Sequence, residues 1–160
     1  MDQTGGQVSI AEPPLGLFEA KCDEKGRLKL PVRFATYLKA LEDKVFITTL
    51  DMRIARIYPR TVWESNQNLF ENAGEDTESA EDIAFIANVY GDFSDVDEAG
   101  RVLMPTDLRR KLEIEKQPVW LDYYRGRINV FPKRIYDERM QRAVVNLGDK
   151  VKNLEKKGLK

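Results

Sequence analysis

Asp23-Glu24-Lys25-Gly26-Arg27 returns later in the chain as Asp97-Glu98-Ala99-Gly100-Arg101. A proline follows four residues after each arginine, at Pro31 and Pro105. The two copies are offset by 74 residues (97 minus 23). Self-similarity at a constant offset indicates that one structural unit occurs twice in a chain. The sequence therefore predicts two small related units that share the same turn.

The residues around each copy predict the same order of elements in both units. Asp23 to Gly26 has turn chemistry, because aspartate bonds the backbone that follows it and glycine accepts a positive φ. Arg27 to Leu30 alternates charged and apolar residues, the pattern of a half-buried strand. Pro31 and Pro105 suit the first turn of a short helix. The other strands are expected at residues 18–22, 45–47, 53–58, 93–96, 102–104, 119–121 and 127–131.

These patterns divide the 160 residues into five segments of an α+β fold. Two helices, at residues 60–73 and 77–90, are expected to connect the units, and apolar residues at helical spacing predict a further helix at 133–157. The segments are a flexible N-terminal arm at 1–16, a first repeat at 17–60, a helical connector at 61–91, a second repeat at 92–132, and a C-terminal helix with a basic tail at 133–160.

Composition excludes several classes of protein. No apolar stretch approaches the roughly 20 residues that span a bilayer, so no membrane partner is expected. The N-terminus lacks the basic and apolar regions of a signal peptide. Cys22 is the only cysteine, which rules out an intrachain disulfide. The default location is therefore the cytoplasm.

The formal net charge of −1 conceals a strong asymmetry. Residues 61–100 contain 11 Asp and Glu and no Lys or Arg, so the other residues hold all 26 basic residues and 16 acidic ones (27 minus 11). Charge within a segment is a better guide to partners than the value for the whole chain. One interpretation is that basic units flank an acidic middle. The alternative is that the middle is an ordinary solvated helical linker.

Catalysis has little support in the residues present. The chain has no histidine, the commonest general base and metal ligand, and Cys22 has no histidine partner to activate it. No spacing resembles a zinc site, a calcium loop or a glycine-rich phosphate loop. Carboxylates such as Asp23 and Asp97 are more typical of turns than of acid–base pairs. We therefore expect no enzyme activity, cofactor, metal or small-molecule substrate.

Binding of a polyanion fits the repeated turn better. An arginine directly after a tight turn can direct its planar fork outward, toward a phosphate or the O6 and N7 edge of guanine. Further basic residues surround Arg27, whereas the second copy has Ala99 and Leu103 at two of the matching positions. The candidate binding residues are Lys21, Lys25, Arg27, Lys29, Arg33 and Arg101, and the turn-forming ones are Asp23, Gly26, Asp97 and Gly100. An equally weighted alternative is that each Asp–Arg pair only stabilises its turn.

The doubled motif resembles the bacterial MraZ family. The resemblance extends from Leu17 to about Leu147 and is carried by residues 23–31, by Tyr58-Pro59 with Trp63, and by residues 97–101 with Pro105. Two such motifs at this spacing, with a helical pair between them, are specific, whereas one alone would be a weak signal.

This resemblance implies a fold of two tandem swapped-hairpin units, related to AbrB and MazE, that close one small β-barrel. It also implies a cytoplasmic, nucleoid-associated regulator that assembles as a ring of protomers. Members of the family bind short G-rich repeats in double-stranded DNA upstream of their own operon, the division and cell-wall gene cluster, and generally repress it. The motif arginine and its basic neighbours are the implied DNA contacts, which here match Arg27, Lys25 and Lys29, with Arg33 beside them. The first copy is the stronger candidate, and the second is expected mainly to complete the barrel.

Two other functions remain open at this point. One is a ring-forming scaffold that has no role on DNA. The other is an antitoxin-like DNA-binding protein, because the swapped-hairpin fold also serves antitoxins. Antitoxins usually carry a disordered tail, whereas residues 133–157 have a regular helical pattern.

Overall fold

A short two-stranded ribbon joins the two repeats. The computed structural model describes residues 12–41 and 44–160, so most of the expected arm lies outside the described residues. Strand β3 (Arg27–Lys29) pairs antiparallel with β7 (Arg101–Leu103), and Leu28 lies opposite Val102. Because these two residues are matching positions of the repeat, a pseudo-twofold axis passes between them.

The other strands form one antiparallel sheet in the order β2-β8-β9-β5-β4-β6. Strands β2, β4 and β5 of the first repeat correspond to β6, β8 and β9 of the second. Equivalent strands therefore occupy equivalent positions counted from the two edges of the sheet. The first strand of each repeat pairs with a strand of the other repeat, β2 with β8 and β6 with β4. The bounds are β2 (Phe18–Lys21), β4 (Lys44–Thr48), β5 (Ala55–Pro59), β6 (Asp92–Asp95), β8 (Pro118–Tyr124) and β9 (Arg127–Pro132).

The α+β class is confirmed, but the strands do not close one continuous barrel. In the described residues the six-stranded sheet and the β3–β7 ribbon are separate sheets. The ribbon is short because Pro31 and Pro105 have no N–H group with which to extend it. Its last bonds run from the Leu30 N–H to the Gly100 carbonyl and from the Met104 N–H to the Gly26 carbonyl, at 2.9 and 3.0 Å.

One hydrophobic core lies between the sheet, the ribbon and two short helices, α2 (Val32–Leu41) and α5 (Thr106–Leu112). Phe34 of α2 and Leu108 of α5 are fully buried, as are Leu28, Ile57 and Leu121 of the strands. Each such side chain contributes roughly 1.5–3 kcal/mol relative to an exposed position. Because both repeats supply these residues, neither repeat could form this core alone.

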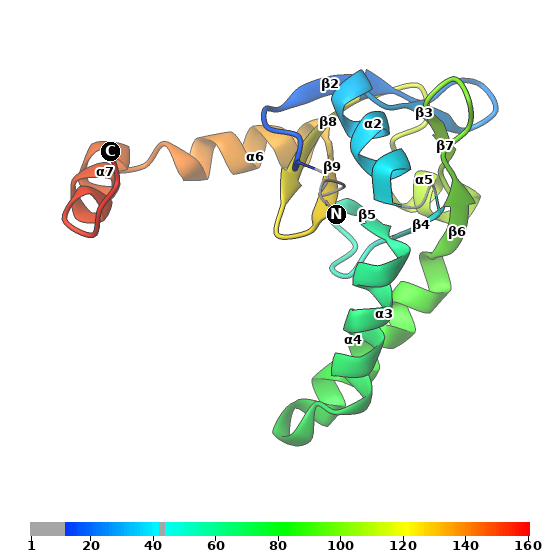
Figure 1. Ribbon diagram of the computed structural model, residues 1–160, viewed down its shortest axis with the longest axis horizontal. Helices are drawn as coiled ribbons and strands as arrows, with labels where there is room; N and C mark the ends of the chain where they lie inside the picture. The colour runs from blue at the N-terminus through cyan, green and yellow to red at the C-terminus, as the bar shows by residue number, and fades with distance from the viewer. Residues whose placement is uncertain (1–11, 42–43) are drawn as a thin grey trace, which may run out of the picture.

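Two helices project from the sheet as an antiparallel hairpin (Figure 1). They are α3 (Arg60–Glu71) and α4 (Thr77–Tyr90), joined by a 3-10 turn, η1 (Gly74–Asp76). Trp63 anchors the hairpin, since its ring stacks on Phe46 of the sheet with 4.5 Å between centroids. The two predicted connector helices are therefore confirmed nearly to their ends. No helix of the described residues is long and apolar enough to cross a membrane.

The C-terminal segment forms two helices where the sequence predicted one. They are α6 (Lys133–Ala143) and α7 (Leu147–Glu155), separated by Asn146 in the left-handed conformation, with φ +53°. Two adjacent β-branched valines precede the break, and asparagine tolerates this conformation better than most residues. Tyr136 of α6 stacks on Trp120 at 4.6 Å, whereas α7 buries no residue and lies far from the sheet (Figure 1).

Candidate nucleic-acid interface

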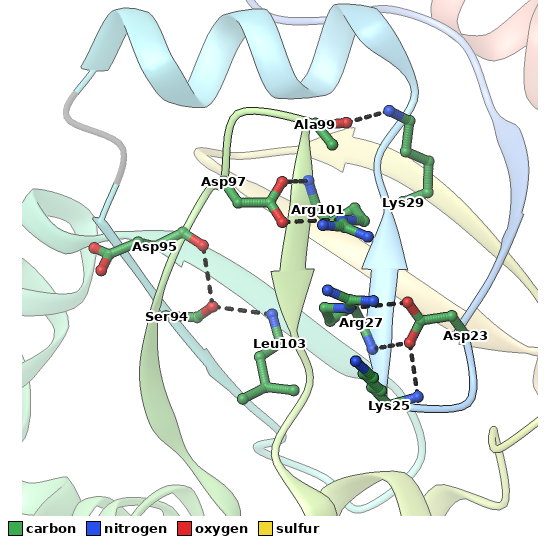
Figure 2. A network of polar contacts seen from close by, with 10 residues as sticks. All are labelled: Asp23, Lys25, Arg27, Lys29, Ser94, Asp95, Asp97, Ala99, Arg101 and Leu103. Atoms are coloured by element: carbon green, nitrogen blue, oxygen red, sulfur yellow. Dashed lines mark hydrogen bonds and ion pairs between the residues drawn. The ribbon is translucent and has the colours of Figure 1, made fainter.

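The outer face of the β3–β7 ribbon gathers basic side chains from both repeats. Successive residues of a strand point to opposite faces. Leu28 and Val102 point into the core, so their neighbours Arg27, Lys29 and Arg101 are on the other face. Figure 2 shows the two arginines next to each other between the strands. The structure therefore unites the two motif copies on one surface.

The first turn holds Arg27 through the Asp23 carboxylate. Oδ1 of Asp23 accepts the backbone N–H groups of Lys25 and Arg27, both at 2.9 Å. Oδ2 accepts the Nε–H of Arg27, also at 2.9 Å. Gly26 donates to the Asp23 carbonyl at 3.0 Å and has φ +82°, a conformation that costs glycine little. One carboxylate thus shapes the turn and orients the arginine that follows it.

The second turn repeats this geometry almost without change. Asp97 accepts the backbone N–H of Arg101 at 2.8 Å and its Nε–H at 2.9 Å, and Gly100 has φ +79°. In the part of the chain that the structure describes, the Nη groups of Arg27 and Arg101 have no hydrogen-bond partner. Since the ion pair engages only the Nε of each guanidinium, turn stabilisation and contact with a ligand are compatible roles for the same residue.

The same hydrogen bonds shift the titration of both aspartates. The backbone N–H of Arg27 is the main group that holds the pKa of Asp23 below its ordinary value of 3.8, and the Arg27 side chain adds to the effect. The backbone N–H of Arg101 lowers the pKa of Asp97 from 3.8 in the same way. Both turns therefore depend on ionised carboxylates.

Acid is expected to weaken the turns at a pH below about 4. A carboxyl with a lowered pKa in the folded state stabilises the protein above its unfolded pKa of 3.8, and this contribution is lost as pH falls through the folded value. We expect the double variant Asp23→Asn/Asp97→Asn to show a flatter decline of unfolding temperature with acid than the wild type. The control is Glu24→Gln/Glu98→Gln, and an equal decline in all three proteins would contradict this role.

Beneath the first turn lies a buried cation that the sequence patterns did not predict. Arg109 of α5 is only 9% exposed and donates through Nη1 to the Met104 carbonyl. Its Nε is 3.6 Å from the Glu115 carboxylate, and a Cβ added to Gly26 would collide with its guanidinium. The matching position of the first repeat is Ala35, which lies beneath Gly100. Comparing the repeats position by position would have shown this arginine on an otherwise apolar helix face.

The other predicted binding residues lie at different places. Lys25 is exposed in the first turn, and Lys29 donates through Nζ to the Ala99 carbonyl of the second turn. Lys21 ends β2 opposite Pro118, outside the ribbon. Arg33 lies on α2, with Nη1 3.5 Å from the Leu15 carbonyl. The ribbon and its turns thus bring together four of the six basic residues, namely Lys25, Arg27, Lys29 and Arg101.

The chain's cysteine lies close to the ribbon but is inert at neutral pH. Cys22 is buried, and burial raises the pKa of its thiol to about 11, although Arg109 opposes the shift. A protonated thiol is a weak nucleophile and a poor metal ligand. Across residues 12–41 and 44–160, no three acidic or thiol groups converge as a metal site would require.

Several known proteins are similar to this chain, although no protein-family model matches it. The transcriptional regulator MraZ of Acidobacterium capsulatum is 32% identical over 100 residues, which are 62% of this chain and 68% of that protein. MraZ of Roseiflexus castenholzii is 34% identical over 108 residues, 66% of this chain and 71% of its own length. MraZ of Pediococcus pentosaceus is 26% identical over 148 residues, which cover 91% of this chain and 99% of the relative.

Proposed function

The chain belongs to the MraZ family of transcriptional regulators, and we propose that it is a sequence-specific DNA-binding repressor of its own operon. Its partners in this proposal are double-stranded DNA and further copies of itself, in the cytoplasm at the nucleoid. The target is a set of short tandem G-rich repeats upstream of the division and cell-wall genes. The observation that carries the proposal is the outer face of the β3–β7 ribbon, where Arg27 and Arg101 lie together.

This face suits the major groove of DNA. The groove is about 12 Å wide and admits a two-stranded β-ribbon. Asp23 and Asp97 each hold the Nε of one arginine, which leaves the Nη groups to meet the O6 and N7 atoms of guanine. An arginine held in advance loses less side-chain entropy when it binds. G-rich repeats are therefore the target that the chemistry of this surface favours.

The lysines are proposed to bind the phosphates on either side of the groove. Lys25 and Lys29 are both exposed; Lys25 lies in the first turn, and Lys29 lies beside the second turn, where its Nζ donates to the Ala99 carbonyl. Contacts to phosphates position a protein on DNA without reading its sequence. Arg33 and Lys21 lie outside the ribbon and would reach DNA only beyond the groove that the ribbon occupies.

Lys29→Ala is expected to reduce the salt dependence of binding. A lysine that neutralises one phosphate contributes about 0.9 to the slope of log K against log salt. We expect the slope to fall by roughly one unit with the base preference unchanged. The measurement is fluorescence anisotropy over a salt series, with the exposed Lys39→Ala of α2 as the matched control. If the slope of Lys29→Ala is unchanged while circular dichroism shows an intact fold, Lys29 does not contact a DNA phosphate.

A scaffold without a role on DNA is the competing function, and the exposed apolar residues of the projecting helices favour it. Leu69, Phe85 and Val89 of the helical hairpin are 63%, 67% and 47% exposed. Size-exclusion chromatography beside a DNA-binding assay separates the two functions. A chain that assembles but does not distinguish its upstream DNA from unrelated DNA would be the scaffold.

A further inference from the structure

Helix α7 lacks the packing that a helix of its length needs. It has nine residues and buries none of them. Isolated helices shorter than about 12–15 residues are only marginally stable in water. Most helix stability in proteins comes from packing one apolar face against a partner. The nine residues of α7 therefore require a surface that the rest of this chain does not supply.

The apolar face of α7 is a continuous stripe accompanied by lysines. Leu147, Val151 and Leu154 recur at the helical spacing of four and three residues and are 48%, 40% and 54% exposed. Val144 extends the stripe toward α6 and is 52% exposed. Residues 144–160 contain five lysines and two acidic residues, a balance of +3. The surface that receives α7 should therefore be both apolar and acidic.

Helix α4, in the hairpin that it forms with α3, presents such a surface. Glu78, Asp82, Phe85 and Val89 recur at spacings of four, three and four, so they form one stripe along the helix. Phe85 is 67% exposed, and Val89 is 47% exposed. Residues 61–91 contain seven acidic residues and no Lys or Arg. The stripe is apolar near the sheet and acidic toward the tip of the hairpin.

We propose that α7 of one copy packs along α4 of a second copy. The apolar stripes would bury each other, and the lysines that accompany α7 would face the carboxylates of the helical hairpin. The inference rests on the self-assembly proposed above and assigns the two surfaces that perform it. Like-charged pairings of α4 with α4, or of α7 with α7, would bring repelling residues together, so the complementary pairing is favoured.

The two surfaces are separate within one chain. Figure 1 shows α4 and α7 on arms that leave the sheet in different directions. A contact between two different patches is heterologous, and such contacts repeat from copy to copy until a ring closes or a filament grows. The ribbon that carries Arg27 and Arg101 lies on neither patch, so every copy in the assembly would keep its basic face available.

The test uses one variant for each patch of the full-length chain. Phe85→Asp places a charge in the α4 stripe and leaves α7 intact, whereas Leu154→Asp does the reverse. We expect each variant alone to run as the 18.5 kDa monomer in light scattering, while the wild type forms larger assemblies. An equimolar mixture should form a heterodimer of about twice 18.5 kDa, because one intact α7 can dock on one intact α4.

Several results would overturn the assignment. A monomeric wild type, or a mixture that stays monomeric, would show that α4 and α7 do not form the contact. Assemblies of Leu154→Asp alone would indicate that α4 pairs with α4, and assemblies of Phe85→Asp alone would indicate that α7 pairs with α7. Val32→Ser, at a residue 78% exposed on α2, is the matched control and should assemble as the wild type does.

DNA binding separates failure of this contact from failure of the proposed function. The monomeric variants should bind a single repeat as the wild type does, but should lose about 10²–10⁴-fold in affinity for tandem repeats because multivalency is lost. If the wild type does not prefer its upstream repeats, while the heterodimer forms as expected, then the function fails and the interface stands.

Discussion

Replacing Arg27 by alanine is expected to abolish specific binding to the upstream repeats while the protein stays folded and assembled. A bidentate arginine–guanine pair is worth about 1–3 kcal/mol of discrimination, or roughly 5- to 150-fold at each site. In an assembly that engages several repeats, this loss is multiplied over every site that is bound. Arg27 is on the ribbon surface and outside the hydrophobic core, so the loss should fall on binding rather than on folding.

Specific affinity is measured by gel shift of the upstream DNA. The competitor is the same DNA with the guanines of the repeats replaced. Arg53→Ala is the matched control, because Arg53 is also an exposed arginine in an ion pair, with Glu138 at 3.3 Å, but it lies outside the ribbon. If Arg27→Ala binds the upstream DNA with unchanged affinity, the ribbon is not the surface that recognises the base sequence. Arg101→Ala tests the second motif copy, for which the sequence predicts a smaller loss.

Gly26→Ala is expected to destabilise the fold by about 2–4 kcal/mol. A left-handed backbone costs an L-residue roughly 1–2 kcal/mol. In addition, the new Cβ would displace the buried Arg109 guanidinium from the Met104 carbonyl and from the half-exposed Glu115, and an uncompensated buried charge costs about 3–5 kcal/mol when it is fully unpaired. Chemical denaturation of both proteins at neutral pH gives the difference in unfolding free energy.

Gly100→Ala provides the internal control for this prediction. Its φ of +79° is close to that of Gly26, but the nearest atoms to the new Cβ would be the Ala35 Cβ at 3.3 Å and the Lys29 Nζ at 3.9 Å, so no atom has to be displaced far. We expect the backbone cost alone, about 1–2 kcal/mol. Arg109→Ala should lower the unfolding free energy less in the Gly26→Ala background than in the wild type, because removing the guanidinium also removes its clash with the new Cβ. Equal destabilisation by the two glycine variants would show that Arg109 does not press on the first turn.

Local sequence patterns predicted the elements of this fold well. The turns, the alternating strands and the connector helices each depend on residues within one short window, and the structure places them within a few residues of the expected bounds. The break at Asn146 was missed because the apolar spacing continues across it. The closed barrel was wrong because its closure depends on how far the ribbon extends, and Pro31 and Pro105 end it early.

The candidate site was predicted only as two separate motifs. Each Asp–Gly–Arg turn can be read from its own residues, but the placement of Arg27 beside Arg101 depends on pairing between strands 74 residues apart in sequence (101 minus 27). The buried Arg109 was missed for the same reason, since its role depends on its position beneath Gly26. Periodicity carries no information about such contacts between repeats.

The exchange of first strands between the repeats also governs how the chain can fold during synthesis. Strand β2 leaves the ribosome on the order of 100 residues before β8, the strand that completes its pairing. The first repeat cannot finish its sheet until β8 of the second repeat has emerged. Contacts between such distant segments slow folding, because the entropy of closing a long loop is lost before any strand pairing stabilises the chain. The nascent first repeat therefore carries an unpaired strand edge until the second repeat has been synthesised.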